Sequence, residues 1–337
     1  MRAIVQREIG GPDVLRLEDV EDPVAGAGQV VVRLRAAAVN HRDTYIRTGQ
    51  YAGIKLPIIP GSDGAGIVAA VGPGVTTTEV GREVVINPSL HWGDDPAIQG
   101  PDWHILGLPE NGTYAELVCV PASAIVAKPA ALSWEETAAI PLAGLTAYRA
   151  VVTRAQVARG QTVLITGIGG GVATFALIFA HHLGARTLVL SGSEEKLAQA
   201  AALGADAGFS SRAPDWVEQV RAAAGGKGPD VVIDSVGGDF FNQVLDVARP
   251  GARIVVYGST LGAVPNMVLR RIFWKHLDVR GSTMGAPGEF NAMVDLFAAG
   301  TAKPDIDKVF PLAEAGAAQA HMDGSAQFGK IVLRCAD

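Results

Sequence analysis

The sequence predicts an α/β fold in which the second half forms a doubly wound parallel sheet. From about Ser133 onward, apolar strand-like runs alternate with helix-like segments, which implies βα units and parallel strand pairing. A glycine cluster at 167–171 separates one such strand from its helix, and Gly and Pro punctuate a β-rich first third. At 337 residues the chain is long enough for two domains.

The expected elements follow in chain order. In the first third, strands are expected at 30–34, 67–71, 83–86 and 115–120, and residues 87–112 form a polar excursion rich in Pro and Gly. Helices are expected at 134–140, 147–153 and 173–183, and buried strands at 162–165, 187–190, 231–233, 253–257 and 278–281. The tail after Pro287 is expected to hold one helix, 290–299, and two strands, 308–311 and 330–334, and to return to the first domain.

Composition excludes several function classes. The net charge is −6, from 28 basic and 34 acidic residues, so the chain lacks the electrostatic footprint of a nucleic-acid-binding protein. The two cysteines, Cys119 and Cys335, lie too far apart to form a metal or disulfide motif. No signal-peptide pattern precedes the strand-like residues 1–6, and the apolar run 172–180 is too short to cross a bilayer. We therefore expect a soluble, cytoplasmic protein without nucleic-acid or membrane partners.

The glycine cluster predicts a dinucleotide site. Glycine lets the backbone approach a pyrophosphate closely, and the start of the following helix offers unpaired N–H groups to an anion. The expected contacts are Gly169, Gly170, Gly171 and Val172. The motif has Val172 where a third glycine is usual, and an ordinary tight turn is the alternative interpretation.

The residues after the next strand predict which dinucleotide binds. NAD sites usually place Asp or Glu there to accept a hydrogen bond from the ribose 2′-hydroxyl. Here the strand is followed by Ser191, Gly192 and Ser193, with Lys196 and Arg212 as candidate cations for a 2′-phosphate. We therefore predict NADPH rather than NADH. Ser193 also fits a simple helix N-cap, and both roles can hold together.

Four segments resemble one enzyme superfamily over essentially the whole chain. They are 38–49 (AVNHRDTYIRTG), 60–66 (PGSDGAG), 144–148 (GLTAY) and the glycine turn. Together they resemble the medium-chain dehydrogenase/reductase superfamily, and within it the zinc-free NADPH:quinone oxidoreductase branch. The resemblance implies a GroES-like catalytic domain at 1–125, completed by 285–337, a Rossmann NADP-binding domain at 126–284, and an active-site cleft between them.

The resemblance also addresses the metal. Zinc members hold the catalytic ion with Cys, His and Cys, and the matching positions here are Asn40, Ser62 and Ala143. None of these is a good zinc ligand, and Asp63 beside Ser62 is a single carboxylate. The excursion 87–112 matches the lobe that carries the structural zinc, yet it has no cysteine. We expect no metal site.

Without a Lewis acid, the expected acceptor is one that is already electrophilic. Zinc polarises an alcohol or ketone oxygen in these enzymes, whereas a quinone or an α,β-unsaturated carbonyl spreads the arriving charge by conjugation. We therefore expect NADPH-dependent reduction of a quinone or enone. The alternatives are reduction of a 2-enoyl thioester and an NADPH-binding module with little turnover; a zinc alcohol dehydrogenase is disfavoured by the three substituted ligands.

Residue roles follow as hypotheses. Asn40 is expected to face the nicotinamide or the acceptor oxygen and to donate a hydrogen bond to developing negative charge. Tyr45 is the candidate proton donor, with simple packing as its alternative, and Asp43 is expected to pair with Arg47. The resemblance places further cofactor contacts at Thr146, Val236, Gly258, Ser259, Phe328, Gly329 and Lys330. Lys330 either reaches a cofactor phosphate or is a solvated residue at a strand start.

The apolar stretch after Ser259 bears on assembly. It contains Val264, Met267, Val268, Leu269 and Ile272. The resemblance implies a homodimer formed through Rossmann-domain edge strands, and this stretch suits such an interface. Burial within the subunit explains the same residues equally well.

Overall fold

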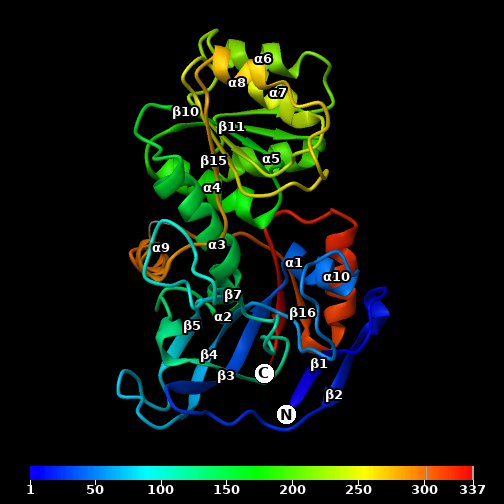
Figure 1. Ribbon diagram of the computed structural model, residues 1–337, viewed down its shortest axis with the longest axis vertical. Helices are drawn as coiled ribbons and strands as arrows, with labels where there is room; N and C mark the ends of the chain where they lie inside the picture. The colour runs from blue at the N-terminus through cyan, green and yellow to red at the C-terminus, as the bar shows by residue number, and fades with distance from the viewer. Residues whose placement is uncertain (301, 336–337) are drawn as a thin grey trace. The chain divides into compact units, whose positions relative to one another are not determined.

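The computed structural model describes residues 1–300 and 302–335, and the chain divides into two compact units. Unit 1 comprises Met1–Leu145 and Gly285–Asp337, and unit 2 comprises Thr146–Met284 (Figure 1). The division falls within helix α3 (Pro141–Tyr148). Each unit is described by itself below.

Unit 2 is built on a six-stranded parallel sheet with the order β12-β11-β10-β13-β14-β15. The strands are β10 (Thr162–Thr166), β11 (Arg186–Ser191), β12 (Ala207–Ser210), β13 (Val231–Asp234), β14 (Arg253–Val256) and β15 (Asp278–Gly281). The chain enters at the middle of the sheet, runs to one edge, and then crosses to build the other half. This is the doubly wound order that the alternation of strands and helices predicts.

Helices cover the sheet of unit 2. They are α4 (Gly171–His182), α5 (Glu194–Ala202), α6 (Trp216–Ala223), α7 (Phe240–Val247) and the short α8 (Leu269–Trp274), and a π-helix at Arg149–Arg154 follows α3. The central strands are buried because helices pack on both faces, so Leu164, Val232 and Ile254 form a core with Trp216 and Phe241 from the helices.

Unit 1 is built on a larger sheet with the order β16-β17-β3-β4-β5-β9, and β8 also pairs with β3. The strands are β3 (Gln29–Ala38), β4 (Asp63–Val71), β5 (Glu83–Ile86), β8 (Leu117–Pro121), β9 (Ile125–Ala127), β16 (Ile306–Pro311) and β17 (Lys330–Arg334). Val332 of β17 pairs with Ala38 of β3. The tail of the chain therefore returns to the N-terminal unit, as the sequence predicts.

The remaining elements of unit 1 surround this sheet. The two-stranded sheets are β1 (Arg2–Gln6) with β2 (Leu15–Asp19) and β6 (Ser89–Leu90) with β7 (His104–Ile105). The helices are α1 (His41–Arg47), α2 (Trp134–Ala139), α9 (Pro287–Ala298) and α10 (Ala315–Asp323), and 3-10 turns lie at Pro12–Val14, Ala122–Ala124 and Leu312–Glu314. Buried side chains of β3, β5 and β17, among them Leu34, Ile86 and Leu333, lie in one core.

Two features differ from the sequence expectation. The tail holds a second helix, α10, whose Ala- and Gly-rich sequence gives no clear apolar period. The predicted helix at 147–153 is the end of α3 followed by the π-helix. Among the helices of the described residues, none has the length and apolar character needed to cross a membrane.

Candidate active site

Asn40 lies at the junction between β3 and α1, where it is the N-cap of the helix. Its backbone N–H donates to the Asp43 carboxylate at 2.9 Å, and the Asp43 N–H donates to the Asn40 carbonyl at 2.9 Å. This exchange satisfies donors that a helix start leaves unpaired and fixes the backbone of Asn40. Asn40 is 6 % exposed.

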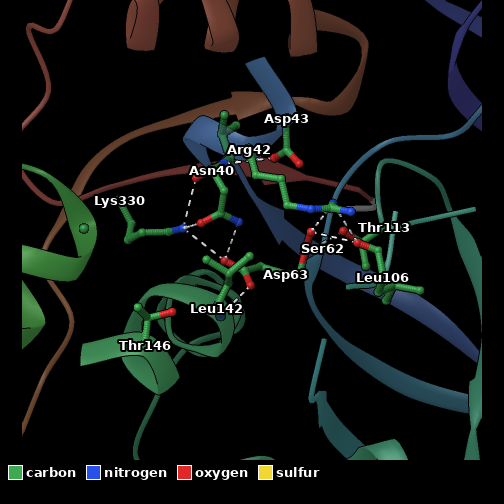
Figure 2. A network of polar contacts seen from close by, with 12 residues as sticks. Asn40, Arg42, Asp43, Ser62, Asp63, Leu106, Thr113, Leu142, Thr146 and Lys330 are labelled. Atoms are coloured by element: carbon green, nitrogen blue, oxygen red, sulfur yellow. Dashed lines mark hydrogen bonds and ion pairs between the residues drawn. The ribbon is translucent and has the colours of Figure 1, made fainter. Parts of the chain in front are cut away.

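The Asn40 side chain lies between a carboxylate and an ammonium (Figure 2). Its Nδ2 donates to Asp63 Oδ2 at 2.9 Å, and its Oδ1 accepts from Lys330 Nζ at 2.7 Å. Lys330 also donates to Asp63 Oδ2 at 3.0 Å and to the Val39 carbonyl at 2.9 Å, so all three of its N–H bonds have acceptors. The second carboxylate oxygen of Asp63 accepts from the Leu142 N–H at 2.7 Å.

The sheet order explains why these residues meet. Asn40 follows the end of β3, Asp63 is the first residue of β4, and Lys330 is the first residue of β17. Because β17 and β4 flank β3 on its two sides, both charged side chains start beside Asn40. Asp63 and Lys330 are both buried, and a buried ion pair persists only when its remaining donors and acceptors are satisfied, as they are here.

Ser62, the second position that matches a zinc ligand, makes hydrogen bonds that stabilise the fold of unit 1. Its hydroxyl donates to the Leu106 carbonyl at 2.8 Å and accepts from Arg42 Nη1 at 3.0 Å. The buried Arg42 guanidinium also donates to the carbonyls of Ile105, Leu106 and Leu108, each at 3.1 Å. Arg42 and Ser62 thereby bind the excursion 87–112 to α1. The third matching position, Ala143, is a buried methyl side chain.

The expected pairing of Asp43 with Arg47 is wrong. Arg47 instead donates to Asp323 at 2.5 Å, to Gln319 at 2.7 Å and to the Gly10 carbonyl at 2.9 Å, so it binds α10 to α1. Asp43 points the other way because its carboxylate caps the helix and accepts from the Tyr114 hydroxyl at 2.9 Å. Burial outweighs the nearby Arg42 charge and raises the pKa of Asp43 to about 6.

Tyr45 is half-buried on α1, one turn after the exposed His41. The ring centroids of the two residues are 6.5 Å apart. His41 is a candidate proton donor that the sequence analysis missed. Its signal was available, since residues four apart on a helix share a face and histidine titrates near neutral pH.

The cofactor-binding residues predicted in unit 2 gather at the carboxyl ends of its strands. The turn after β10 uses Gly167 at φ +63° and Gly169 at φ +117°, both in the left-handed region that favours glycine. A Cβ on Gly169 would lie 2.6 Å from Lys196 Cδ. Gly170 is the N-cap of α4, and Gly171 and Val172 are its first residues. The α4 N-terminus and the glycine backbone suit a pyrophosphate.

The two predicted cations, Lys196 and Arg212, lie near the loop that follows β11. Ser193 Oγ accepts from the Lys196 N–H at 3.4 Å, which confirms its role as the N-cap of α5, and Ser191 Oγ accepts from the Ser193 N–H at 3.1 Å. A Cβ on Gly192 would lie 3.1 Å from Arg212 Nε. Lys196 therefore lies against the glycine turn, and Arg212 lies against the serine loop.

The loop after β13 lies beside the glycine turn, and the loop after β14 lies beside the loop after β13. A Cβ on Gly167 would be 3.4 Å from Val236 Cγ2, and one on Gly258 would be 3.2 Å from the Cβ of Ser235. Ser259 packs against Gly237, where a Cβ would lie 2.4 Å from its hydroxyl oxygen. Val236 therefore lies against the glycine turn, and Gly258 and Ser259 lie against the loop after β13. Thr146 lies on α3, with its Oγ1 3.7 Å from Met284 Sδ.

The turn before β17 is fixed by its own contacts in unit 1. The N–H of the buried Phe328 donates to Asp307 Oδ1 at 3.0 Å. Gly329 has φ +90°, and a Cβ there would lie 2.4 Å from the Asp305 carbonyl oxygen. The turn therefore requires glycine and delivers Lys330 to Asn40; a contact with the cofactor stays a prediction for all three residues.

The donor set does not resemble a metal centre. Within residues 1–300 and 302–335, no three His, Cys, Asp or Glu side chains are grouped so that they could hold a metal ion. At the positions that match zinc ligands, an amide, a hydroxyl and a methyl group replace the thiolates and imidazole that zinc prefers.

Two family descriptions match the chain. Residues 26–130 match the alcohol dehydrogenase GroES-like domain, and residues 171–299 match the zinc-binding dehydrogenase family. Among curated proteins, a zinc-type alcohol dehydrogenase-like protein, YogA, from Leptosphaeria maculans is 36% identical over 87% of this chain and 86% of its own length. A 2-haloacrylate reductase from Burkholderia sp is 33% identical, covering 99% of this chain and 98% of that protein. Human quinone oxidoreductase is 30% identical, covering 99% and 97%.

Solved structures of oxidoreductases also superpose on this chain. An NAD-dependent alcohol dehydrogenase superposes with a TM-score of 0.96 at 39% identity, covering 100% of both chains. The crotonyl-CoA carboxylase/reductase AntE, in complex with NADP, superposes with a TM-score of 0.90 at 26% identity, covering 99% of this chain and 94% of that one. With a GroES-like unit and a Rossmann-like parallel sheet, the chain belongs to the medium-chain dehydrogenase/reductase superfamily and is an oxidoreductase of that group.

Proposed function

We propose that this protein uses NADPH to reduce a quinone or an α,β-unsaturated carbonyl without a metal. The observation that carries the proposal is the content of the three positions that match zinc ligands. Asn40 is bonded to Asp63 and Lys330, Ser62 is bonded to Arg42 and Leu106, and position 143 is alanine. This donor set suits hydrogen bonding to an oxygen and does not suit Lewis-acid activation of an alcohol.

The residues of unit 1 would act on the acceptor. Bound NADPH supplies the hydride. The Asn40 amide donates a hydrogen bond to the oxygen on which negative charge develops, and its fixed position avoids reorganisation during the reaction. Tyr45 and His41, neighbours on one face of α1, are the candidates that deliver the proton.

The choice of NADPH rests on charge at the loop after β11. Lys196 and Arg212 lie against the glycine turn and the serine loop, where a 2′-phosphate would be bound. Ser191 and Ser193 stand where an NAD-specific site would place a carboxylate that repels this phosphate. The relatives include proteins named for either NAD or NADP, so the residues of this chain carry the argument.

We also propose a homodimer formed by the edge of unit 2. Strand β15 ends the six-stranded sheet, and no residue of α8 is buried. Three large apolar side chains are exposed together on α8: Leu269 at 64%, Phe273 at 62% and Trp274 at 71%. Single exposed apolar residues are common on protein surfaces, whereas such a group suits an interface. Sedimentation analysis of the wild type and of a Phe273→Glu/Trp274→Glu variant tests this. A wild type that sediments as a monomer at micromolar concentration contradicts the proposal.

Steady-state assays of NADPH oxidation test the reaction. The panel holds a 1,4-quinone, an enone, a 2-enoyl thioester and, in the reverse direction with NADP⁺, a primary alcohol. We expect turnover with the quinone or enone, unchanged by a strong chelator, and a large loss in Asn40→Ala. Alcohol oxidation as the main activity, dependent on stoichiometric zinc, overturns the proposal. Faster thioester reduction favours that alternative, and tight NADPH binding with no turnover favours a binding module.

A further inference from the structure

The contacts of Asn40 allow only one orientation of its side-chain amide. An ammonium only donates hydrogen bonds, and a carboxylate only accepts them. Lys330 therefore must face the amide oxygen, at 2.7 Å, and Asp63 must face the amide nitrogen, at 2.9 Å. A flipped amide would place its N–H₂ against the ammonium and its oxygen against the carboxylate, which would break both bonds.

We infer that Lys330, together with Asp63, is a positioning residue for catalysis that acts through Asn40. Asp63 takes one of the two Nδ2–H bonds of Asn40 (Figure 2). In this inference the fixed amide presents the second N–H to the reacting oxygen of the acceptor. The ammonium also polarises the amide through Oδ1, which strengthens the remaining N–H as a donor. This inference rests on the proposed function, since it concerns the same reaction.

Burial supports a role beyond stability. Asp63 is fully buried, and Lys330 is 3 % exposed. A buried ion pair costs desolvation, and well-packed apolar residues often replace one without loss of stability. Such residues could not hold an amide in one orientation, and here both charges are directed at the same amide.

The contacts of Lys330 also separate this role from phosphate binding. Its three N–H bonds go to Val39, Asn40 and Asp63, all in unit 1. An ammonium used in this way has no donor left for a cofactor phosphate. The inference therefore predicts that loss of Lys330 lowers kcat and leaves NADPH affinity unchanged, whereas a phosphate ligand would show the opposite pattern.

The experiment compares Lys330→Met with the double variant Lys330→Met/Asp63→Asn. The single variant leaves a buried carboxylate without its cation, so we expect a lower Tm. The double variant removes both charges, and we expect it to regain most of that Tm, so its kinetics report on a folded enzyme. Lys308→Met is the matched control, because Lys308 is an exposed lysine on the neighbouring strand β16.

With the quinone or enone that the wild type reduces, we expect kcat of the double variant to fall by about 10- to 100-fold. The dissociation constant of NADPH should change by less than about twofold, and Lys308→Met should match the wild type. A folded double variant with wild-type kcat overturns the inference. A rise of about tenfold or more in the NADPH dissociation constant, with kcat unchanged, assigns Lys330 to the cofactor instead.

A second readout does not depend on turnover. The side-chain amide signal of Asn40 in a ¹⁵N-correlated NMR spectrum is assigned by its loss in Asn40→Ala. We expect it at shifts removed from those of exposed asparagines in the wild type, and near them in the double variant. An identical Asn40 signal in both proteins overturns the inference even if no acceptor is reduced. Absence of turnover in the wild type would instead overturn the proposed function.

Discussion

Replacing Arg212 with glutamine tests the assignment of the 2′-phosphate site. The substitution removes the positive charge beside Gly192 and keeps a polar, shorter side chain. A hydrogen bond between a charged pair contributes about 1.5–3 kcal/mol, and solvent exposure lowers this value. Arg212 is exposed, so we expect a loss of about 1–2 kcal/mol, which is about a 5- to 30-fold rise in the NADPH dissociation constant.

The assay is a fluorescence titration with NADPH and with NADH at two salt concentrations. NADH lacks the 2′-phosphate, so its dissociation constant should change by less than about twofold in Arg212→Gln. Added salt should shrink the difference between wild type and variant, because screening weakens exposed charge pairs. Lys227→Gln, which removes an exposed cation elsewhere in unit 2, is the control. Tighter NADH binding by the wild type, or an equal loss for both cofactors, refutes the reasoning.

Three further predictions concern buried or strained positions. Arg42→Met leaves three carbonyls of the excursion 87–112 without their donor. We expect the free energy of unfolding in urea to fall by about 3–5 kcal/mol and proteolysis within 87–112 to become faster. Resistance to protease equal to that of the wild type counts against this role. As the pH rises from 4 to 7, the free energy of unfolding of Asp43→Asn should increase relative to that of the wild type by up to about 3 kcal/mol. The raised pKa of Asp43, about 6, means that the folded state holds its proton more tightly than the unfolded state, so wild-type stability falls as pH rises through this range; parallel pH profiles would contradict it. Gly169→Val adds a side chain at φ +117° against Lys196, and we expect at least a tenfold weaker NADPH affinity, measured by titration, with unchanged binding as the contrary result.

Much of the fold follows from local sequence pattern. Strands β5 and β17 have the boundaries predicted from the sequence, because short apolar runs bounded by polar residues define buried strands clearly. Strand β15 also has its predicted boundaries, but it lies at the edge of its sheet and none of its residues is buried, so the expectation of a buried strand there is wrong. The glycine turn before α4 and the Ser193 N-cap of α5 can also be predicted, because each depends only on neighbouring residues in the sequence. Helix α10 is different, because its alanines and glycines become a helix only by packing on α1 and β17.

The site was predictable in its members and unpredictable in its partners. The resemblance singles out Asn40, Asp63 and Lys330, but Lys330 and Asp63 lie 267 positions apart, and their contact depends on the sheet order. The same reason explains Arg42, whose acceptors are carbonyls of the excursion that no side-chain pattern marks. Arg47 was assigned the wrong partner because its acidic neighbour on α1 was already used as a helix cap.

The late position of strand β17 in the chain has a consequence for folding during synthesis on the ribosome. Asp63 is synthesised early, whereas the cation that neutralises it arrives with the last strand that the structure describes. Until then the nascent first unit holds an uncompensated acid at the start of β4, while all of the second unit has already been synthesised. Translation that stops before Lys330 should therefore yield a chain in which the parallel sheet of unit 2 can form and unit 1 is unstable.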